Sequence, residues 1–324
     1  MVAAIAVNDF QHVSDFIRVL SMGNITPRQK GILYATLSGV FFGLLGFYGV
    51  RVMQTGMSVF TMLFWRYLVA SMCMMLVCML SRDTSRAPPM ELAKVFLWGV
   101  LFYSGSSIFY FLASQTLGTG LSMALLYTYP AMVMLAGLLF QGRIPGLYSL
   151  LALLVMMPGL WALTLGGSFH ITALGMVWGL LSALTYSLYV LISKDSPVNP
   201  MLSTLMVSLG CLVTCLGGAL VEGSFSMPQT AACWEYILIL AIVCTSLPIV
   251  LLLKGLELLS PLEVSILSVL EPVFILFFGI TLLHETLSLA QALGALLLIG
   301  GSLLSLREPM DVNAERTDCQ YTPR

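Results

Sequence analysis

The sequence predicts an all-α integral membrane protein in which ten transmembrane helices form two five-helix inverted repeats. Three observations support this fold class. Hydrophobic residues make up 59% of the chain and charged residues only 9%, whereas a soluble domain carries about 25% charged residues. Apolar runs of helical length recur along the chain. The second half also repeats the layout of the first.

Each predicted span is about 20 residues long, which is roughly 30 Å of helix at about 1.5 Å per residue and matches the hydrocarbon core of a bilayer. Inside lipid every backbone group must be bonded internally, and runs this long and this apolar exclude barrel strands. The spans are expected at residues 31–50, 57–80, 94–113, 118–140, 146–166, 173–193, 200–221, 234–253, 260–282 and 287–306.

Residues 254–306 repeat the layout of residues 112–164 about 142 positions later. The matched positions are Pro130 with Pro272, Arg143 with Glu285, Gly159 with Gly301 and, further back, Gly31 with Gly175. Five spans per copy is an odd number, so the second copy crosses the membrane in the opposite sense. The predicted units are a tail (1–30), a first repeat (31–166), a second repeat (173–306) and a second tail (307–324).

Lysine and arginine residues set the predicted orientation. With the N-terminus inside, 12 of the 14 basic residues fall in inside segments. Arg51 falls in an outside loop, and Arg66 lies within the second span. Because loops rich in lysine and arginine stay on the cytoplasmic side, this bias predicts that both termini are cytoplasmic.

Two charged residues are predicted to lie at membrane depth. Glu271 is ten residues into the ninth span, where an ionised carboxylate costs about 2.5–3.5 kcal/mol. It is a candidate proton or cation-substrate site, or a structural acid that bonds groups freed by Pro272, and both interpretations stay open. For Arg66, about nine residues into its span, we favour a structural anchor to backbone carbonyls. The alternative is a counter-charge for an anionic substrate or for Glu271.

Pro130, Pro248 and Pro272 are predicted to kink their spans, because proline removes a backbone donor and clashes with the preceding turn. Broken helices at membrane depth are tolerated where the freed carbonyls face protein or a water-filled cavity. The repeat-related pair Pro130 and Pro272 is therefore expected to mark a cavity wall, with improved packing as the alternative explanation.

Polar side chains at helical spacing form stripes that we expect to converge on a central path. The stripes are Tyr103, Ser107, Tyr110 and Ser114 on the third span, Ser182, Tyr186 and Tyr189 on the sixth, and Ser265, Ser268 and Glu271 on the ninth. Hydrogen bonding between helices explains any single serine as well, whereas tyrosines at mid-span favour an aromatic pocket. By the repeat, Tyr129 takes the place of Glu271, so one wall of the pocket is acidic and the other phenolic.

The second, fourth and ninth spans also carry a recognisable set of residues, which are Phe64-Trp65-Arg66-Tyr67, Tyr129-Pro130 and Glu271-Pro272, followed by Glu285. Together with two five-helix halves of about 130 residues, this set resembles the paired EamA domains of the drug/metabolite transporter superfamily. The resemblance covers residues 31–306. One difference is Arg143, which stands where that family usually has a glutamate after the fourth span.

The resemblance implies a secondary carrier that moves small metabolites across a bacterial inner membrane, frequently amino acids or their derivatives outward. We therefore expect a multi-pass transporter that exports an amino-acid-like solute by alternating access. In this hypothesis Glu271 and Arg66 hold the two charges of a zwitterion. The alternative is an uptake carrier for a cofactor or nucleoside-like metabolite such as S-adenosylmethionine. Protons are the candidate coupling ion, and a homodimer is the candidate assembly.

Other functional classes fit the residues less well. An intramembrane enzyme needs a nucleophile with a base, or a metal pair, and the predicted spans contain neither histidine nor aspartate. A channel would show flux that does not saturate and no counterflow. His170 and His284 fall at loop ends without a second ligand nearby, so no metal site is predicted, and no cofactor is expected.

Overall fold

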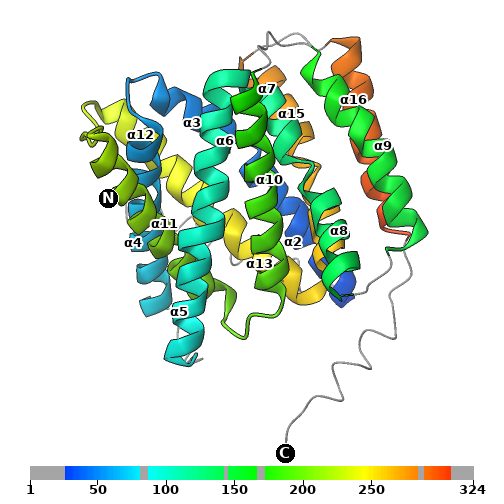
Figure 1. Cartoon of the computed structure of the whole chain (residues 1–324), viewed down its shortest axis with the longest axis horizontal. Coiled ribbons are helices and arrows are strands. Elements are labelled where there is room, and N and C mark those ends of the chain that lie inside the picture. Colours follow the sequence, from blue (N-terminus) through cyan, green and yellow to red (C-terminus); the bar gives the residue numbers. More distant parts are fainter. Residues whose placement is uncertain (1–25, 81–86, 142–144, 166–171, 284–287, 308–324) are drawn as a thin grey trace, which may run out of the picture.

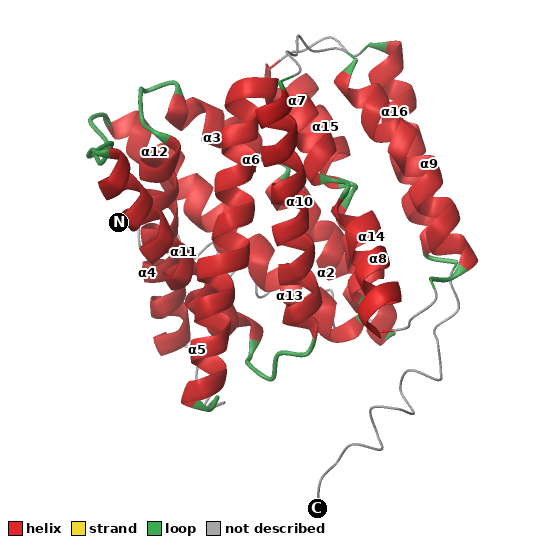
Figure 2. Cartoon of the chain, viewed as in Figure 1, coloured by secondary structure: helices red, strands yellow, loops and turns green. Residues whose placement is uncertain are grey.

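The computed structural model of the chain describes residues 26–80, 87–141, 145–165, 172–283 and 288–307. Within these ranges the regular structure is helical throughout, with no strand (Figure 2). Nine helices in the described part are long and apolar enough to cross a membrane, and the shorter apolar helix Leu289–Ser305 follows them. The predicted all-α membrane fold is therefore confirmed.

The first half of the chain contains five predicted spans, three of which are built from more than one helical segment. The segments are α2 (Pro27–Phe42) with α3 (Leu45–Met53), α4 (Val59–Leu80), α5 (Pro89–Trp98) with the π-helical turn η1 (Gly99–Tyr103) and α6 (Ser104–Leu117), α7 (Thr119–Leu126) with α8 (Tyr129–Gln141), and α9 (Leu147–Thr164). The first span was expected to be continuous, but it is interrupted between α2 and α3.

The second half follows the same plan, with an unbroken first span. Its segments are α10 (Ala173–Lys194), α11 (Pro200–Glu222), α12 (Ala231–Ala241) with the π-helical turn η2 (Ile242–Ser246) and α13 (Leu247–Leu258), α14 (Pro261–Ser268) with α15 (Glu271–Leu283), and α16 (Leu289–Ser305). The third and eighth spans are 29 and 28 residues long, which is longer than predicted because the helices continue past the apolar runs into polar segments such as 114–117 and 254–258.

Irregular features recur at equivalent places in the two halves. The turns η1 and η2 begin at Gly99 and Ile242, and the helices that follow the two breaks begin at Tyr129 and Glu271. These offsets agree with the offset of about 142 read from the sequence. A repeat of local irregularities is stronger support for two related copies than a repeat of hydropathy, because any ten-helix protein repeats its hydropathy.

The two halves are interleaved in space (Figure 1). The most extensive helix contacts each join one helix from the first half to one from the second, namely α9 with α16, α4 with α11, α6 with α10, and α2 with α13. Large apolar side chains such as Met79, Leu154 and Leu296 are exposed on the outside of the bundle. An exposed apolar surface of this kind fits contact with lipid.

Small residues let α9 and α16 approach closely, and they do so symmetrically. A Cβ atom at Gly159 would lie 3.0 Å from the carbonyl oxygen of Gly294, and a Cβ at Gly301 would lie 3.0 Å from that of Ala152. Gly159 and Gly301 are repeat-related, as are Ala152 and Gly294. The same contact is therefore made twice, as expected where equivalent helices of two copies pack against each other.

Candidate functional site

A cavity lies in the interior of the bundle, bounded by side chains from both halves. It contains about 670 Å³ of space free of protein atoms, including the part open to solvent. The lining residues are Phe42, Leu45, Gly46, Arg66, Tyr103, Ser106, Ser107, Tyr110, Phe111, Met123, Leu126, Tyr127, Tyr129, Tyr186, Glu271 and Ile275. The described part of the lining is thus mainly aromatic and apolar, with two serines, one basic and one acidic side chain.

The two broken spans bring Tyr129 and Glu271 to the cavity. Tyr129 is the first residue of α8 and Glu271 the first of α15, so both lie at the start of a half-helix. Pro130 and Pro272 follow directly, in the first turn, where a missing backbone N–H has no helical partner to lose. The prolines therefore start new helices after a break and do not bend a continuous one.

Pro248 has a different setting, although it was predicted as a third kink. It lies in the first turn of α13, immediately after the π-helical turn η2, and the chain runs on helically on both sides. Its carbonyl oxygen accepts a hydrogen bond of 2.8 Å from the Ser38 hydroxyl of α2. Pro248 is fully buried and does not line the cavity.

Glu271 is partly accessible because its side chain borders the cavity. The Tyr127 hydroxyl lies near its carboxyl group, close enough to interact with it electrostatically. Its backbone is covered by α2, where a Cβ at Gly39 would lie 3.7 Å from the Glu271 nitrogen. The glutamate is therefore held from two sides, by a phenol of the first half and by close backbone packing against the first span.

Arg66 is almost fully buried, with 1% of its surface exposed. Its Nε donates a hydrogen bond of 2.6 Å to the Thr245 hydroxyl of η2, and its Cζ lies 5.0 Å from the centroid of the Tyr67 ring. The contact that we observe is thus with a side-chain hydroxyl. Nε is the one nitrogen of Arg66 with a hydrogen-bond partner among the described residues, and Arg66 is one of the residues that line the cavity.

Arg66 and Glu271 line the same cavity without pairing with each other. In the part of the chain that the structure describes, the ion pairs within 4.0 Å are Arg28–Glu263 and Lys94–Glu91. Opposite charges in a low-dielectric setting attract strongly, and a charge without a partner is costly there. Two unpaired opposite charges in one cavity can both be neutralised by a ligand that carries a charge of each sign.

Tyrosines form most of the aromatic lining. The Tyr129 and Tyr186 rings are 4.8 Å apart in an edge-to-face arrangement, and Tyr103 lies 6.2 Å from Tyr186. The Tyr129 hydroxyl donates a hydrogen bond of 3.1 Å to the Ser265 carbonyl oxygen of α14, which ties the two broken spans together. Tyr110 also lines the cavity, where its hydroxyl approaches Gly46.

The other predicted site residues lie beside the cavity and do not line it. The Ser114 hydroxyl donates to the Phe111 carbonyl, that of Ser265 to Leu262 and that of Ser268 to Val264, each within its own helix. Tyr189 packs edge-to-face on Tyr103 at 4.9 Å, behind the lining. For the three serines, hydrogen bonding to the preceding turn accounts for the position without a ligand.

Tyr127 and Thr245 are residues of the site that the sequence analysis did not identify. Thr245 holds Arg66 from the turn η2, and Tyr127 lines the cavity beside Glu271. Tyr127 lies in the break between α7 and α8, and by the repeat it corresponds to Val269, so the internal comparison gave no sign of it. The signal that was available is the segment Tyr127-Thr128-Tyr129 directly before a proline. Arg143, Glu285, His170 and His284 lie outside the described residues.

Comparison with known proteins agrees with this architecture. A match to the EamA-like transporter family covers residues 29–165 and 173–307. The chain belongs to this family. EamA proteins have a ten-helix membrane fold, and the chain is accordingly a multi-pass membrane transporter with a small-molecule substrate.

Individual relatives of this EamA protein are similar over most of their length. An "Uncharacterized transporter" of Archaeoglobus fulgidus is 27% identical over 267 residues, which is 82% of this chain and 93% of the relative. The "Uncharacterized transporter YcbK" of Bacillus subtilis is 24% identical over 296 residues, which covers 86% and 93% of the two chains. A solved crystal structure with 19% identity superposes with a TM-score of 0.71 over 89% of this chain and 98% of the other, which shows a shared fold.

Proposed function

We propose that this EamA transporter is a secondary carrier that moves an amino-acid-like zwitterion across a bacterial cytoplasmic membrane. The observation that carries the proposal is the pair of opposite charges, Arg66 and Glu271, which border one cavity and do not pair with each other. A substrate carboxylate would bind Arg66, and a substrate ammonium group would bind Glu271. Simultaneous pairing neutralises both protein charges, which neither an amine nor a carboxylic acid achieves alone.

The aromatic lining supports an amphipathic cargo. Tyr110, Tyr129 and Tyr186 offer ring faces and edges to an apolar side chain, and a protonated amine is attracted to such faces. The same rings also suit a flat nucleobase. S-adenosylmethionine, which is itself an amino acid with a nucleobase, is therefore the second candidate substrate.

Glu271 is also our candidate for proton coupling. Among the described residues it is the one acidic residue of the cavity lining, and the Tyr127 hydroxyl lies near its carboxyl group. A carboxyl group can bind either a proton or the substrate ammonium group, but not both at once. Its exchange of one for the other therefore links proton movement in one direction to substrate movement in the opposite direction. This chemistry favours substrate–proton exchange, which exports the cargo when protons flow inward. Export is also the direction that the family resemblance favours.

We further propose alternating access, in which the repeats 31–166 and 173–306 move relative to each other. The cavity residues Leu45, Leu126 and Ile275 belong to α3, α7 and α15, which lie toward one end of the bundle, whereas α5, α8 and α13 lie toward the other (Figure 1). The first end carries the loops predicted to be outside. In this proposal the structure corresponds to an outward-facing state, and the tails 1–30 and 307–324 are cytoplasmic.

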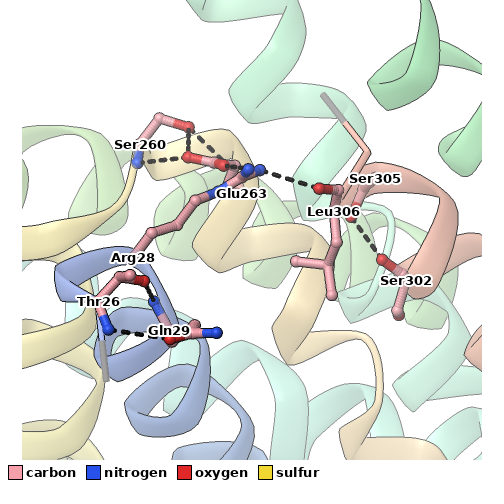
Figure 3. Close-up of polar contacts among 8 residues, drawn as sticks. All are labelled: Thr26, Arg28, Gln29, Ser260, Glu263, Ser302, Ser305 and Leu306. Atoms are coloured by element: carbon pink, nitrogen blue, oxygen red, sulfur yellow. Dashed lines mark hydrogen bonds and ion pairs between the residues drawn. The ribbon is translucent and has the colours of Figure 1, made fainter. Parts of the chain in front are cut away.

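Polar contacts at the opposite end support this assignment (Figure 3). Arg28, at the start of α2, pairs with Glu263 in the first turn of α14 at 3.1 Å, and it donates to the Leu306 carbonyl at 3.1 Å. Lys194, at the end of α10, donates to the carbonyl oxygens of Leu256 and Leu259 at 2.7 and 3.1 Å. The Arg28 contacts join the first half to the second, and the Lys194 contacts join two spans of the second half, all at the end that we assign to the cytoplasm.

Counterflow in proteoliposomes tests the proposal directly. Vesicles are preloaded with unlabelled amino acids, nucleosides or S-adenosylmethionine, and the uptake of trace radiolabelled solute is followed with each preload. Accumulation driven by an amino acid preload supports the proposed cargo, and accumulation driven only by S-adenosylmethionine selects the second candidate. Folded protein that shows no counterflow with any preload would contradict the carrier mechanism for these solutes.

A further inference from the structure

The π-helical turn η2 places two consecutive hydroxyls against the backbone of its own helix. Thr245 Oγ1 donates to the Leu240 carbonyl oxygen at 2.6 Å, and Ser246 Oγ donates to that of Ala241 at 3.0 Å. Both bonds reach five residues back, whereas hydroxyls in a regular α-helix reach three or four. The wider turn therefore determines where these two side chains point. Single π-turns inside α-helices are frequently found at functional sites.

The two hydroxyls differ in one respect. Thr245 also accepts the hydrogen bond from Arg66 Nε at 2.6 Å, and Thr245 is fully buried. No hydrogen bond joins Ser246 to Arg66 among the described residues. Because the Thr245 proton is used on the Leu240 carbonyl, its oxygen can only accept from the arginine. The hydroxyl is thus fixed in the orientation that holds Nε.

Holding Nε fixes the whole guanidinium, because this group is planar and rigid. The Tyr67 ring supports it, with Cζ 5.0 Å from the ring centroid, and the Tyr67 hydroxyl is itself bonded to Ser107 at 2.6 Å. No hydrogen bond joins the two terminal nitrogens of Arg66 to another described residue, and Arg66 is one of the residues that line the cavity. Parallel N–H groups of this kind match the two oxygens of a carboxylate.

The other π-helical turn delivers a second group to the same place. Tyr103 is the last residue of η1 and lines the cavity, and its ring lies 6.4 Å from that of Tyr67. The wall beside Arg66 is therefore built by the irregular turns of both repeats. One turn contributes the hydroxyl that holds the arginine, and the other contributes an aromatic side chain to the lining.

We infer that Thr245 is a positioning and specificity-determining residue, which orients Arg66 so that its two terminal nitrogens bind the carboxylate of the transported solute. The inference rests on the proposed function and assigns the anionic end of the substrate to a defined place. It predicts that the carrier distinguishes an amino acid from the amine left when the carboxylate is removed, and that Thr245 controls this discrimination.

The test uses Thr245→Val, which keeps the shape of the side chain and removes its hydroxyl, with Thr245→Ser as the conservative variant. Ser246→Ala is the matched control, because it removes the neighbouring hydroxyl of the same turn without touching Arg66. Counterflow is measured in proteoliposomes for two pairs of solutes, L-leucine with 3-methylbutylamine and L-phenylalanine with 2-phenylethylamine. Thermal unfolding of each purified variant reports whether it is folded.

We expect Thr245→Val to raise KM for the amino acids about tenfold or more, as for the loss of a hydrogen bond to a charged group. KM for the amines and the maximal rates should change little. Thr245→Ser should restore amino acid KM, and Ser246→Ala should leave it near the wild-type value. A purely structural role of Thr245 would instead impair amino acids and amines equally.

Two results would overturn the inference in different ways. If the wild type transports the amino acids and folded Thr245→Val does so with unchanged KM, then Thr245 does not position Arg66 for substrate, while the proposed function stands. If the wild type exchanges neither amino acid, the proposed cargo is wrong and the inference fails with it. An equal effect of Ser246→Ala and Thr245→Val would also contradict it, because the turn alone would then explain the result.

Discussion

Gly210 of α11 faces the backbone of the third span at a distance that leaves no room for a side chain. A Cβ at this position would lie 2.3 Å from the Phe96 carbonyl oxygen and 2.8 Å from the Val100 nitrogen. Ordinary contact begins near 3.4 Å, so alanine would push the two spans apart by about 1.1 Å. The obstacles are backbone atoms, which cannot rotate away as a side chain can.

The displacement would also stretch two hydrogen bonds across the interface. Thr214 Oγ1 donates to the Val100 carbonyl at 3.1 Å, and Cys211 Sγ donates to that of Gly99 at 3.4 Å. Overpacking typically costs about 1–3 kcal/mol. At about 2–4 °C per kcal/mol, we expect Gly210→Ala to lower the apparent melting temperature by several degrees. Because η1 ends at the cavity residue Tyr103, transport should fall as well.

Gly217→Ala is the matched control for this prediction. Gly217 lies seven residues further along the same helix, and a Cβ there meets no atom within 4 Å. Alanine at this position should leave stability unchanged or raise it slightly, because it restricts the unfolded chain. Thermal unfolding in detergent, followed by tryptophan fluorescence, measures both variants. Equal melting temperatures for Gly210→Ala, Gly217→Ala and the wild type would refute the reasoning.

Three further predictions concern transport. Glu271→Gln should abolish substrate accumulation driven by a pH gradient, while counterflow at equal pH persists with a raised KM because the neutral amide no longer pairs with the substrate ammonium. Full activity of this variant at every pH would exclude the proton role. Tyr127→Phe should slow transport, because it removes the hydroxyl that lies near the Glu271 carboxyl group. Tyr110→Phe should have a smaller effect, and equal rates of the two variants would contradict this difference. In an otherwise cysteine-free chain that carries Arg28→Cys and Glu263→Cys, a short thiol-reactive crosslinker that reducing agents cleave should block transport until the crosslink is reduced. Unimpeded transport after complete crosslinking would argue against movement at this end.

The sequence alone was sufficient to predict the membrane spans and the internal repeat. Apolar runs must be helices of bilayer length, and the matched positions Pro130 and Pro272 located the two broken spans correctly. It was not sufficient for the interruption between α2 and α3 or for the turns η1 and η2. The interruption between α2 and α3 and the turn η1 contain no proline, and glycine is common throughout membrane helices, so local composition does not distinguish them. For η2 the one sign was Pro248, which lies two residues beyond the end of the turn.

Part of the candidate site was also readable in advance. Arg66 and Glu271 stood out because a charge at membrane depth is costly, and both line the cavity. The predicted serines Ser114, Ser265 and Ser268 instead bond their own helices. A stripe at helical spacing shows which residues share a face of one helix, but not whether that face meets a cavity or another helix.

By itself, therefore, the sequence determined the number of helices, the internal repeat and the two charged residues at membrane depth, where a charge has a high free-energy cost. Only the tertiary structure decided which partners those charges have. Thr245 contacts Arg66 across 179 positions of the chain, and Tyr127 lies near Glu271, which is 144 positions away (271 − 127). The physical reason is that helix identity depends on local hydropathy and backbone bonding, whereas each of these contacts depends on how helices of the two halves interleave. No local pattern encodes that arrangement.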